Sequence, residues 1–420
     1  AIGGSRMIGR WLLSETQYSQ NIEASTNVMI YGAGAAGRQL SIALTQSSEY
    51  RPVAFIDDSV ELQGQSINGI IIISRNDLDR MIETKNVTEV LLAIPSLSRS
   101  KRNEIINYLE PYSVLVRSLP GVSELAQGKL KIADLMDVSI IDLLGRDSVN
   151  ANKELLSQNI TNKVVMVTGA GGSIGSELSR QILILKPQVI ILFEQSEFAL
   201  YKINQELVNI DTSNTKILPI LGSVNNRKRL NHIMQCLLVN TIYHAAAYKH
   251  VPMVESNNAE GVSNNIFGTL ACAQVAIENG VENFVLISTD KAVRPTNTMG
   301  ATKRVAEMIL QALALERRTC FSMVRFGNVL DSSGSVVPLF REQIKGGGPI
   351  TVTDPEILRY FMSIHEAVQL VIQAGAMAQG GDMFVLDMGK PVRIFDLAKK
   401  MISLSAVSYT HLTLPTIYSV

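Results

Sequence analysis

Short apolar runs alternate with segments of helical periodicity along most of the chain. The first series of such runs occupies Val28–Tyr31, Pro52–Ile56, Glu89–Ile94 and Ser113–Val116. Strands that alternate with crossover helices in this way form parallel sheets. The pattern therefore predicts a Rossmann-like α/β domain over residues 27–119.

A second, longer series begins after Asn162 and contains six strand-like runs. They are predicted at Val164–Val167, Val189–Phe193, Lys216–Leu221, Thr241–His244, Asn283–Ser288 and Cys320–Arg325. Helical segments between them are expected near 176–185, 197–209, 225–236, 260–279 and 301–316. So long an alternation is typical of a doubly wound parallel sheet. We assign residues 162–406 to this domain, with a small substrate lobe from Phe340 to Leu404.

The remaining segments have weaker patterns. We interpret residues 1–26 as a linker that would follow a membrane region outside this sequence, and residues 120–161 as a connector between the two domains. Residues 407–420 match neither an element nor a linker, and we set them aside as a foreign tail.

Composition narrows the function classes. Of the 420 residues, 46% are apolar and 18% charged, which excludes a largely disordered chain. Lys plus Arg and Asp plus Glu both total 38, so the basic excess typical of nucleic-acid binding is absent. Neither the three cysteines nor the five histidines have metal-ligand spacing, and we expect no metal site. Reduced thiols indicate a cytosolic compartment, and no apolar stretch is long enough to cross a bilayer.

A glycine motif follows the first strand of the second domain and opens a helix. In this context, Gly169 permits a tight turn, Gly172 lets the backbone approach a pyrophosphate, and Gly175 lets the helix pack close to the strand. The N–H groups at the start of that helix, from Ser173 and Ile174, would hold the phosphates. The motif predicts a dinucleotide site.

The next strand ends at Glu194, where a carboxylate can accept the ribose 2′-OH and would repel a 2′-phosphate. We therefore expect NAD rather than NADP, although a solvated strand end would look the same. Residues that follow the third and fourth strands complete the predicted cofactor site: Ser223, Val224, Ala245 and Ala246.

The first domain has a formally similar motif, Gly32-x-Gly34-x-x-Gly37, with Asp57 at the end of its second strand. No catalytic constellation follows it. The motif is equally compatible with nucleotide binding and with a packing or regulatory module.

Candidate catalytic residues follow the fifth strand of the second domain. Ser288, and Lys303 on the next helix, match the layout of short-chain dehydrogenases, which use Ser and Tyr-x-x-x-Lys. The tyrosine position is Met299, whose thioether cannot transfer a proton. Asp290 and Lys291 are then the candidates for acid–base chemistry, unless they merely form a solvated turn.

Five longer motifs resemble the membrane-anchored nucleotide-sugar 4,6-dehydratases of the CapD-like polysaccharide biosynthesis family, within the extended short-chain dehydrogenase/reductase superfamily. They are TGAGGSIGSEL from Thr168, HAAAYKHVP from His244, STDKAVRPTNTMGATK from Ser288, RFGNVLDSSGSVVPLF from Arg325 and GGPITVTDPEILRYFM from Gly347. The resemblance covers residues 27–404, and methionine at position 299 is typical of the family's large form.

The resemblance implies that a UDP-sugar such as UDP-N-acetylglucosamine loses water across C5 and C6 after oxidation at C4. Lys291 would remove the C5 proton and Asp290 would protonate the departing hydroxyl. Ser288 and Thr289 would contact the C4 oxygen.

The resemblance also places substrate contacts at Lys249, His250, Asn328 and Arg359, although Arg359 could form an ordinary ion pair. Asn265 would support the active-site backbone. His244 and His365 are expected in the core or behind the site.

Two other functions remain open: a nucleotide-sugar epimerase, which usually keeps tyrosine at position 299, and a non-catalytic dinucleotide sensor. The resemblance implies that the full-length protein sits at the cytoplasmic face of a bacterial inner membrane, and a homo-oligomer is compatible with the sequence.

Overall fold

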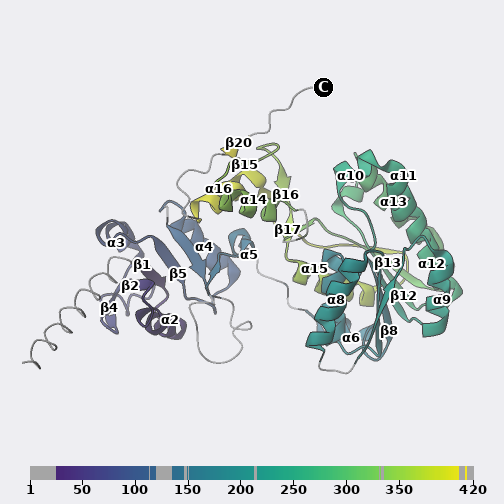
Figure 1. Cartoon of the computed structure of the whole chain (residues 1–420), viewed down its shortest axis with the longest axis horizontal. Helices are drawn as coiled ribbons and strands as arrows, with labels where there is room; N and C mark the ends of the chain where they lie inside the picture. Colours follow the sequence, from purple (N-terminus) through teal and green to yellow (C-terminus); the bar gives the residue numbers. More distant parts are fainter. Residues whose placement is uncertain are drawn as a thin grey trace, which may run out of the picture. The chain divides into compact units, whose positions relative to one another are not determined.

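A computed structural model describes residues 25–112, 114–119, 135–145, 149, 151–211, 215–330, 332, 335–405 and 412–413. These residues form two compact units, which are described separately (Figure 1). The second unit comprises Ser148–Ser335 and Arg359–Pro391, and the first comprises the rest. The predicted linker 1–26, much of the connector 120–161 and most of the tail 407–420 lie outside the described residues.

The first unit contains a seven-stranded sheet in the order β3-β4-β2-β1-β5-β6-β7. Its strands are β1 (Thr26–Tyr31), β2 (Tyr50–Ile56), β3 (Ser66–Ile67), β4 (Ile70–Ile73), β5 (Glu89–Leu92), β6 (Leu115–Ser118) and β7 (Met136–Asp137). Its helices include α2 (Ala35–Thr45), η1 (Arg75–Asp77), α3 (Leu78–Lys85), α4 (Arg99–Leu109) and α5 (Ile140–Leu144). The central strands are parallel, as predicted, and the edge strands β3 and β7 pair antiparallel. The short strands β3 and β4 were not predicted.

Two helices from the far end of the chain, α14 (Val336–Lys345) and α16 (Ile394–Ser403), belong to the first unit. The N–H of Val116 on β6 donates to the carbonyl of Leu404 at 3.2 Å. The sequence analysis assigned both helices to the domain 162–406. The structure places them in the first unit instead, because each helix has an apolar face that packs there. Ile344 on α14 and Met401 on α16 line one pocket together with residues of β6 and α5.

The second unit contains a seven-stranded, wholly parallel sheet in the order β10-β9-β8-β11-β12-β13-β18. Its strands are β8 (Val164–Thr168), β9 (Val189–Glu194), β10 (Lys216–Leu221), β11 (Thr241–His244), β12 (Asn283–Ile287), β13 (Cys320–Arg325) and β18 (Asp382–Val385). All six predicted strands are present. Buried apolar clusters cover both faces of the sheet, which confirms the doubly wound α/β fold.

The connections of the second unit are mostly helical. They are α6 (Lys153–Gln158), α7 (Ser173–Ile184), α8 (Glu197–Ile210), α9 (Arg227–Leu237), α10 (Val251–Ser256), α11 (Asn258–Val262), the π-helix η3 (Ser263–Phe267), α12 (Gly268–Glu278), the 3₁₀ turn η4 (Asp290–Ala292), α13 (Thr298–Ala314) and α15 (Ile364–Met377). Strands β14 (Asn328–Val329) and β17 (Phe361–Met362) pair with each other. The chain order reverses between β8 and β11, which is where ligands bind in such sheets.

Four further short strands lie in the C-terminal part of the chain: β15 (Ile350–Thr351), β16 (Leu358–Arg359), β19 (Val392–Arg393) and β20 (Leu412–Thr413). Strand β20 pairs with β15, although it falls within the segment that the sequence analysis set aside as a tail. Within the described ranges, no helix is both long and apolar enough to cross a membrane.

Candidate active site

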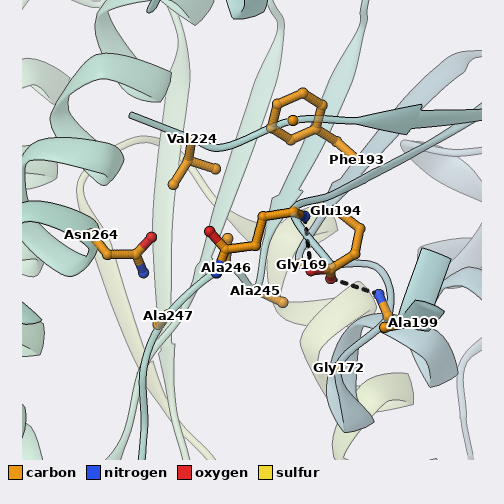
Figure 2. A pocket seen from close by; sticks show the side chains of 13 residues that line it. Gly169, Gly172, Phe193, Glu194, Ala199, Val224, Ala245, Ala246, Ala247 and Asn264 are labelled. Carbon is orange, nitrogen blue, oxygen red and sulfur yellow. Dashed lines mark hydrogen bonds between the residues drawn. The ribbon is translucent and has the colours of Figure 1, made fainter. Parts of the chain in front are cut away.

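A pocket opens at the carboxyl ends of the strands on either side of the β8–β11 reversal (Figure 2). Backbone and small side chains dominate its walls. Its lining residues are Gly169, Gly171, Gly172, Phe193, Glu194, Gln195, Ala199, Gly222, Val224, Ala245, Ala246, Ala247 and Asn264. A glycine-rich pocket at the switch point lies where dinucleotides bind in such sheets.

The glycine turn is closed by contacts that leave no room for side chains. Gly169 has a φ of +69°, and a Cβ there would lie 2.8 Å from the backbone of Ala246. A Cβ on Gly175 would lie 2.0 Å from the carbonyl oxygen of Gly169. Gly172, which is the N-cap of α7, lines the pocket and has no side-chain cap bond. The N-cap glycine thus supplies no side-chain hydrogen bond to the start of α7, which fits a phosphate ligand.

Glu194 is buried beside this turn and is not a solvated strand end. Its carboxylate accepts the backbone N–H of Gly171 at 3.0 Å, of Gln195 at 2.8 Å and of Ser196 at 3.0 Å. The side chain thus shapes the pocket wall as well as placing a negative charge there.

Other predicted cofactor residues fall into two groups. Val224, Ala245 and Ala246 line the pocket, whereas Ser173, Ile174 and Ser223 do not. The Ser223 hydroxyl instead accepts the N–H of Asn225 at 3.3 Å. The sequence analysis missed several lining residues, namely Gly171, Phe193, Gln195, Ala199, Gly222, Ala247 and Asn264. Gly222 could have been found, since it directly follows a predicted strand.

The loop after β12 brings three predicted residues together. The Nζ of Lys291 donates to Asp290 Oδ1 at 3.1 Å and to Asn328 Oδ1 at 3.4 Å. The Thr289 hydroxyl donates to the same Asp290 oxygen at 3.0 Å and accepts the N–H of Lys291. The Lys291 and Asp290 side chains are 33% and 41% exposed, and Asn328 is half-buried, so the cluster is open to a ligand.

Ser288 lies behind this cluster rather than in it. Its hydroxyl donates to Glu307 Oε1 at 2.6 Å, and Glu307 is fully buried. Arg325 donates to both carboxylate oxygens, at 2.7 and 2.5 Å, and Arg304 donates to one at 3.2 Å. The Ser288 proton is therefore engaged inside the protein, and the expected contact of Ser288 with the C4 oxygen of a sugar stays a prediction. Glu307 was missed by the sequence analysis.

Met299 and Lys303 lie one turn apart on α13, and both are buried. Burial lowers the pKa of Lys303 to about 8, and the nearby charge of Glu307 opposes this effect. A Cβ on Gly300 would lie 2.3 Å from the carbonyl oxygen of Lys291. The start of α13 therefore packs directly on the backbone of the Asp290–Lys291 turn.

The remaining predicted substrate residues lie at the surface of the second unit. Lys249 and His250 are exposed and line a second pocket at the start of α10. Arg359 is also exposed, and it precedes Tyr360, whose carbonyl accepts the N–H of Asn328 at 3.0 Å. The described contacts do not join Lys249 or His250 to the Asp290–Lys291 pair.

Two supporting residues behave as the sequence predicted. Asn265 holds the backbone of Tyr248 through both of its amide atoms, at 2.8 and 3.0 Å. His244 lies in the core between Thr168 and Thr269. Burial, followed by the charge of Lys303, lowers the pKa of His244 to about 3, so the ring is neutral at physiological pH.

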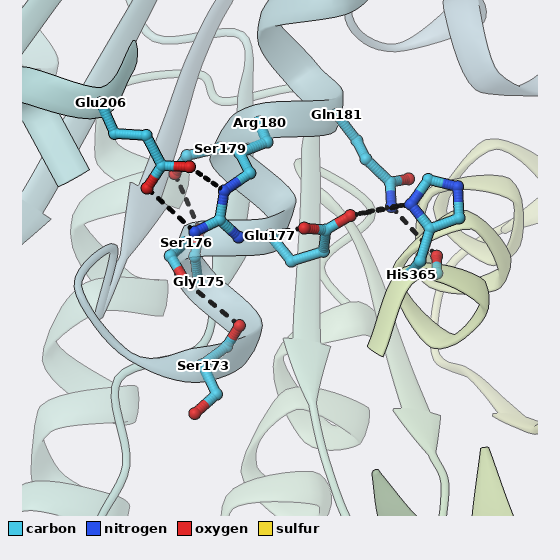
Figure 3. A network of polar contacts seen from close by, with 9 residues as sticks. All are labelled: Ser173, Gly175, Ser176, Glu177, Ser179, Arg180, Gln181, Glu206 and His365. Carbon is cyan, nitrogen blue, oxygen red and sulfur yellow. Dashed lines mark hydrogen bonds and ion pairs between the residues drawn. The ribbon is translucent and has the colours of Figure 1, made fainter. Parts of the chain in front are cut away.

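His365 differs from the expectation, because its side chain is 64% exposed. It belongs to a polar network that anchors α7 (Figure 3). Glu177 on α7 contacts His365 Nδ1 at 2.9 Å, and Arg180 contacts Glu206 on α8 at 2.5 Å. Burial raises the pKa of Glu177, but hydrogen bonds from His365, Gln181 and Arg180 outweigh it and bring the pKa to about 2. The helix that carries the glycine turn is thus held from two sides.

The glycine motif of the first unit is surrounded by side chains that bind one another. Asp57 accepts the N–H of Ala33 at 2.7 Å. Next to it, Asp58 binds Arg75 at 2.5 Å, and the Tyr31 hydroxyl donates to Asp58 at 3.0 Å. In neither unit do the described residues include a group of His, Cys, Asp or Glu that could hold a metal ion.

Comparisons with known proteins show the family to which the chain belongs. The family described as "Polysaccharide biosynthesis protein" matches residues 165–417, a range that extends into the segment set aside as a tail. Capsular polysaccharide biosynthesis protein CapD of Staphylococcus aureus is 44% identical over 409 residues, which are 96% of this chain and 68% of that protein. Probable polysaccharide biosynthesis protein EpsC of Bacillus subtilis is 42% identical over 408 residues, with the same coverage.

Solved structures show the same fold. Pen from Bacillus thuringiensis has a TM-score of 0.58 and 34% identity, over 62% of this chain and 81% of that chain. DesIV, a dTDP-glucose 4,6-dehydratase from Streptomyces venezuelae solved with NAD and TYD, has a TM-score of 0.54 over 60% of this chain and 84% of its own. Its identity is 19%, so this likeness concerns the fold.

Proposed function

Since the chain belongs to the polysaccharide biosynthesis protein family, we propose that it is a nucleotide-sugar 4,6-dehydratase. The substrate would be a UDP-linked hexose such as UDP-N-acetylglucosamine, and the product a 4-keto-6-deoxy sugar. The contact of Lys291 with Asp290 and Asn328, in a site where the usual tyrosine is Met299, carries this proposal.

The site residues fit a nicotinamide dinucleotide, since the glycine N-cap of α7 and the glycine walls of the pocket suit its phosphates. When bound, NAD would accept hydride from C4 of the sugar and return it to C6. Lys303 would face the nicotinamide ribose, and Glu194 would face the adenosine ribose.

The proton chemistry belongs to the Asp290–Lys291 pair. A dehydratase needs a neutral amine to take the C5 proton and a carboxylic acid to protonate the C6 hydroxyl as it leaves. Transfer of one proton along the 3.1 Å hydrogen bond from Lys291 to Asp290 produces both forms at once. Asn328 would keep the Lys291 amine in place during this exchange.

The choice of NAD over NADP rests on Glu194. A buried carboxylate at the pocket wall repels a 2′-phosphate, and three backbone N–H groups already fix its position. We expect NAD to bind at least about tenfold more tightly than NADP, as measured by titration calorimetry on the purified chain. Equal affinities would contradict this role of Glu194.

A second candidate is an epimerase, because UDP-glucose 4-epimerase of Rickettsia rickettsii is 38% identical over 231 residues, 53% of this chain. An epimerase has no need of a base and an acid at C5 and C6. The third candidate, a dinucleotide sensor, has no need of either group.

Mass spectrometry separates these functions. The protein is incubated with NAD and UDP-N-acetylglucosamine, and in parallel with UDP-glucose, in deuterated water. A dehydratase gives a product lighter by one water, with solvent deuterium at C5. An epimerase gives an isomer of unchanged composition, and a sensor returns the substrate unaltered. Either of the last two results would reject the proposal.

From the family resemblance, we propose a membrane location for the full-length protein, and we further propose that it forms a homo-oligomer. Fractionation of cells that express the whole gene would test the first, and light scattering the second.

A further inference from the structure

Glu307 is the most deeply buried charged side chain beside the candidate site, and it has no part in the chemistry above. It is 0% exposed, and it accepts hydrogen bonds from Ser288, Arg325 and Arg304. A buried carboxylate is tolerated when it is paired and hydrogen-bonded. Burial raises its pKa, but the bonds from Arg325, Ser288 and Arg304 prevail and hold the pKa below its ordinary value.

Two partners of Glu307, Ser288 and Arg325, lie at the start of the loops that follow β12 and β13, and these loops carry Lys291 and Asn328. Ser288 directly precedes Thr289 and Asp290 at the end of β12, and its N–H also bonds to the neighbouring strand β13. Arg325 is the last residue of β13, three positions before Asn328. One carboxylate thus joins the ends of the two strands that carry Lys291 and Asn328. A change in the distance between the ends of β12 and β13 would therefore alter the 3.4 Å contact between Lys291 and Asn328.

Glu307 also acts on Lys303, which lies one helical turn earlier on α13. Its negative charge raises the pKa of that buried amine, against the effect of burial. The other charged groups of this neighbourhood are Arg304 on α13 and Arg325 on β13, both bound to Glu307, while His244 on β11 is neutral.

We propose that Glu307 is a positioning residue. It sets the spacing between the Asp290–Lys291 turn and Asn328 by joining the ends of β12 and β13. This inference rests on the proposed function for its effect on turnover. Its effect on the two lysines can be measured without any substrate.

The test uses two variants that separate charge from shape. Glu307→Gln keeps the shape and removes the charge, whereas Glu307→Asp keeps the charge and moves the oxygens away from Arg325. The control is Glu278→Gln, which makes the same chemical change in an exposed pair with Arg227. Thermal unfolding of each purified chain checks that the variants fold.

Competitive acetylation with mass spectrometry reports the reactivity of the part-exposed Lys291, and carbon-13 NMR of labelled lysine side chains across a pH series reports the pKa of the buried Lys303. Neither measurement needs substrate. In Glu307→Gln, we expect the pKa of Lys303 to fall below its wild-type value and the acetylation rate of Lys291 to change. In Glu307→Asp, we expect the Lys303 pKa to stay closer to wild type, while the Lys291 rate still changes. Glu278→Gln should match wild type for both lysines.

Turnover of the nucleotide sugar supplies the second readout. Both Glu307 variants should lower kcat by about tenfold or more, with a smaller change in KM, because the predicted substrate contacts other than Asn328 lie outside the hydrogen bonds of Glu307. Unchanged lysine titrations in a folded Glu307→Gln variant would overturn the inference. If wild type turns nothing over, the proposed function fails, but the lysine titrations still decide the role of Glu307. If neither variant folds, Arg325→Lys replaces them: it keeps a cation beside Glu307, and a wild-type Lys291 rate in that variant would equally reject the inference.

Discussion

Lys303 is buried with its charged amine, and its burial should make the free energy of unfolding depend on pH. Its pKa is about 8 in the folded chain, against an ordinary value of 10.5. Folding therefore disfavours the protonated amine. This lowers the free energy of unfolding by its full amount below pH 8, and the effect disappears above pH 10.5. The shift corresponds to about 3 kcal/mol.

Replacement of Lys303 by Met should accordingly raise the free energy of unfolding near pH 7 by up to about 3 kcal/mol, since Glu307 keeps both arginine partners. The gain should shrink as the pH rises from 8 towards 10.5, because wild type then loses the charge. Urea unfolding at a series of pH values measures this difference. A Met variant that is less stable than wild type at pH 7 would contradict the assignment.

Lys291 should be needed for elimination but not for folding, because it is part-exposed. Lys291→Ala should lower the rate of water loss by at least about a hundredfold and leave the unfolding temperature and NAD binding unchanged. The control is Lys228→Ala, at an exposed position on α9. Full turnover by the Lys291 variant would refute its role as the base.

Sequence reasoning identified the residues of the acid–base cluster but not the carboxylate behind it. Asp290 and Lys291 follow a predicted strand, so their place at the sheet edge could be predicted. Glu307 looks like an ordinary helix-surface residue, because an i, i+4 spacing from Lys303 suggests a solvated ion pair. Its burial depends on β12 and β13 being neighbours, which no local pattern records.

At the scale of the elements, the glycine motif at the start of α7 has one position, Gly175, that leaves no room for a side chain. Gly175→Ala would place a methyl group 2.0 Å from the Gly169 carbonyl, so α7 must move away from β8. We expect this variant to lose NAD binding by at least about tenfold and to unfold at a lower temperature.

The control is Gly34→Ala in the glycine motif of the first unit. A Cβ at Gly34 has no atom within 4 Å, and φ there is negative. The unfolding temperature and NAD affinity of this variant should equal those of wild type. Calorimetric titration and thermal melts compare the two variants, and equal NAD binding by both would argue against a cofactor at the α7 turn.

The strands were easier to predict than the helices, for a physical reason. Strands buried on both faces carry continuous apolar runs, as in Val164–Val167, and these are readable locally. The helix expected over residues 260–279 is instead divided by the π-helix η3. That irregularity coincides with Asn265, whose side chain holds the backbone of Tyr248. This contact is tertiary, and the periodicity of the sequence gives no indication of it or of the π-helix.

At the scale of the whole molecule, the division into units departs from the division of the sequence. The segment Val336–Leu358 interrupts the second unit along the chain and Val392–Ser405 follows it, yet both segments pack in the first unit. Sequence patterning assigned them to 162–406 because neighbouring elements usually share a domain. An apolar helix face indicates that something covers it but does not identify the covering element.

A truncated chain tests this packing. A fragment that begins at residue 148 removes β6 and α5, and should leave the apolar residues Ile344, Met401 and Leu404 exposed. We expect it to bind a hydrophobic dye and to aggregate, in contrast to the full chain. A monomeric fragment 148–405 with no dye binding would show that α14 and α16 need no cover from β6 and α5.

The return of α16 to the first unit also has a consequence for biosynthesis. A ribosome makes proteins from the N-terminus, so β6 emerges long before Leu404, to which it is hydrogen-bonded in the finished protein. Every residue of the second unit is translated in that interval. The first unit therefore cannot complete its packing during translation until α16 has been made, and its apolar residues near β6 are accessible to chaperones until then.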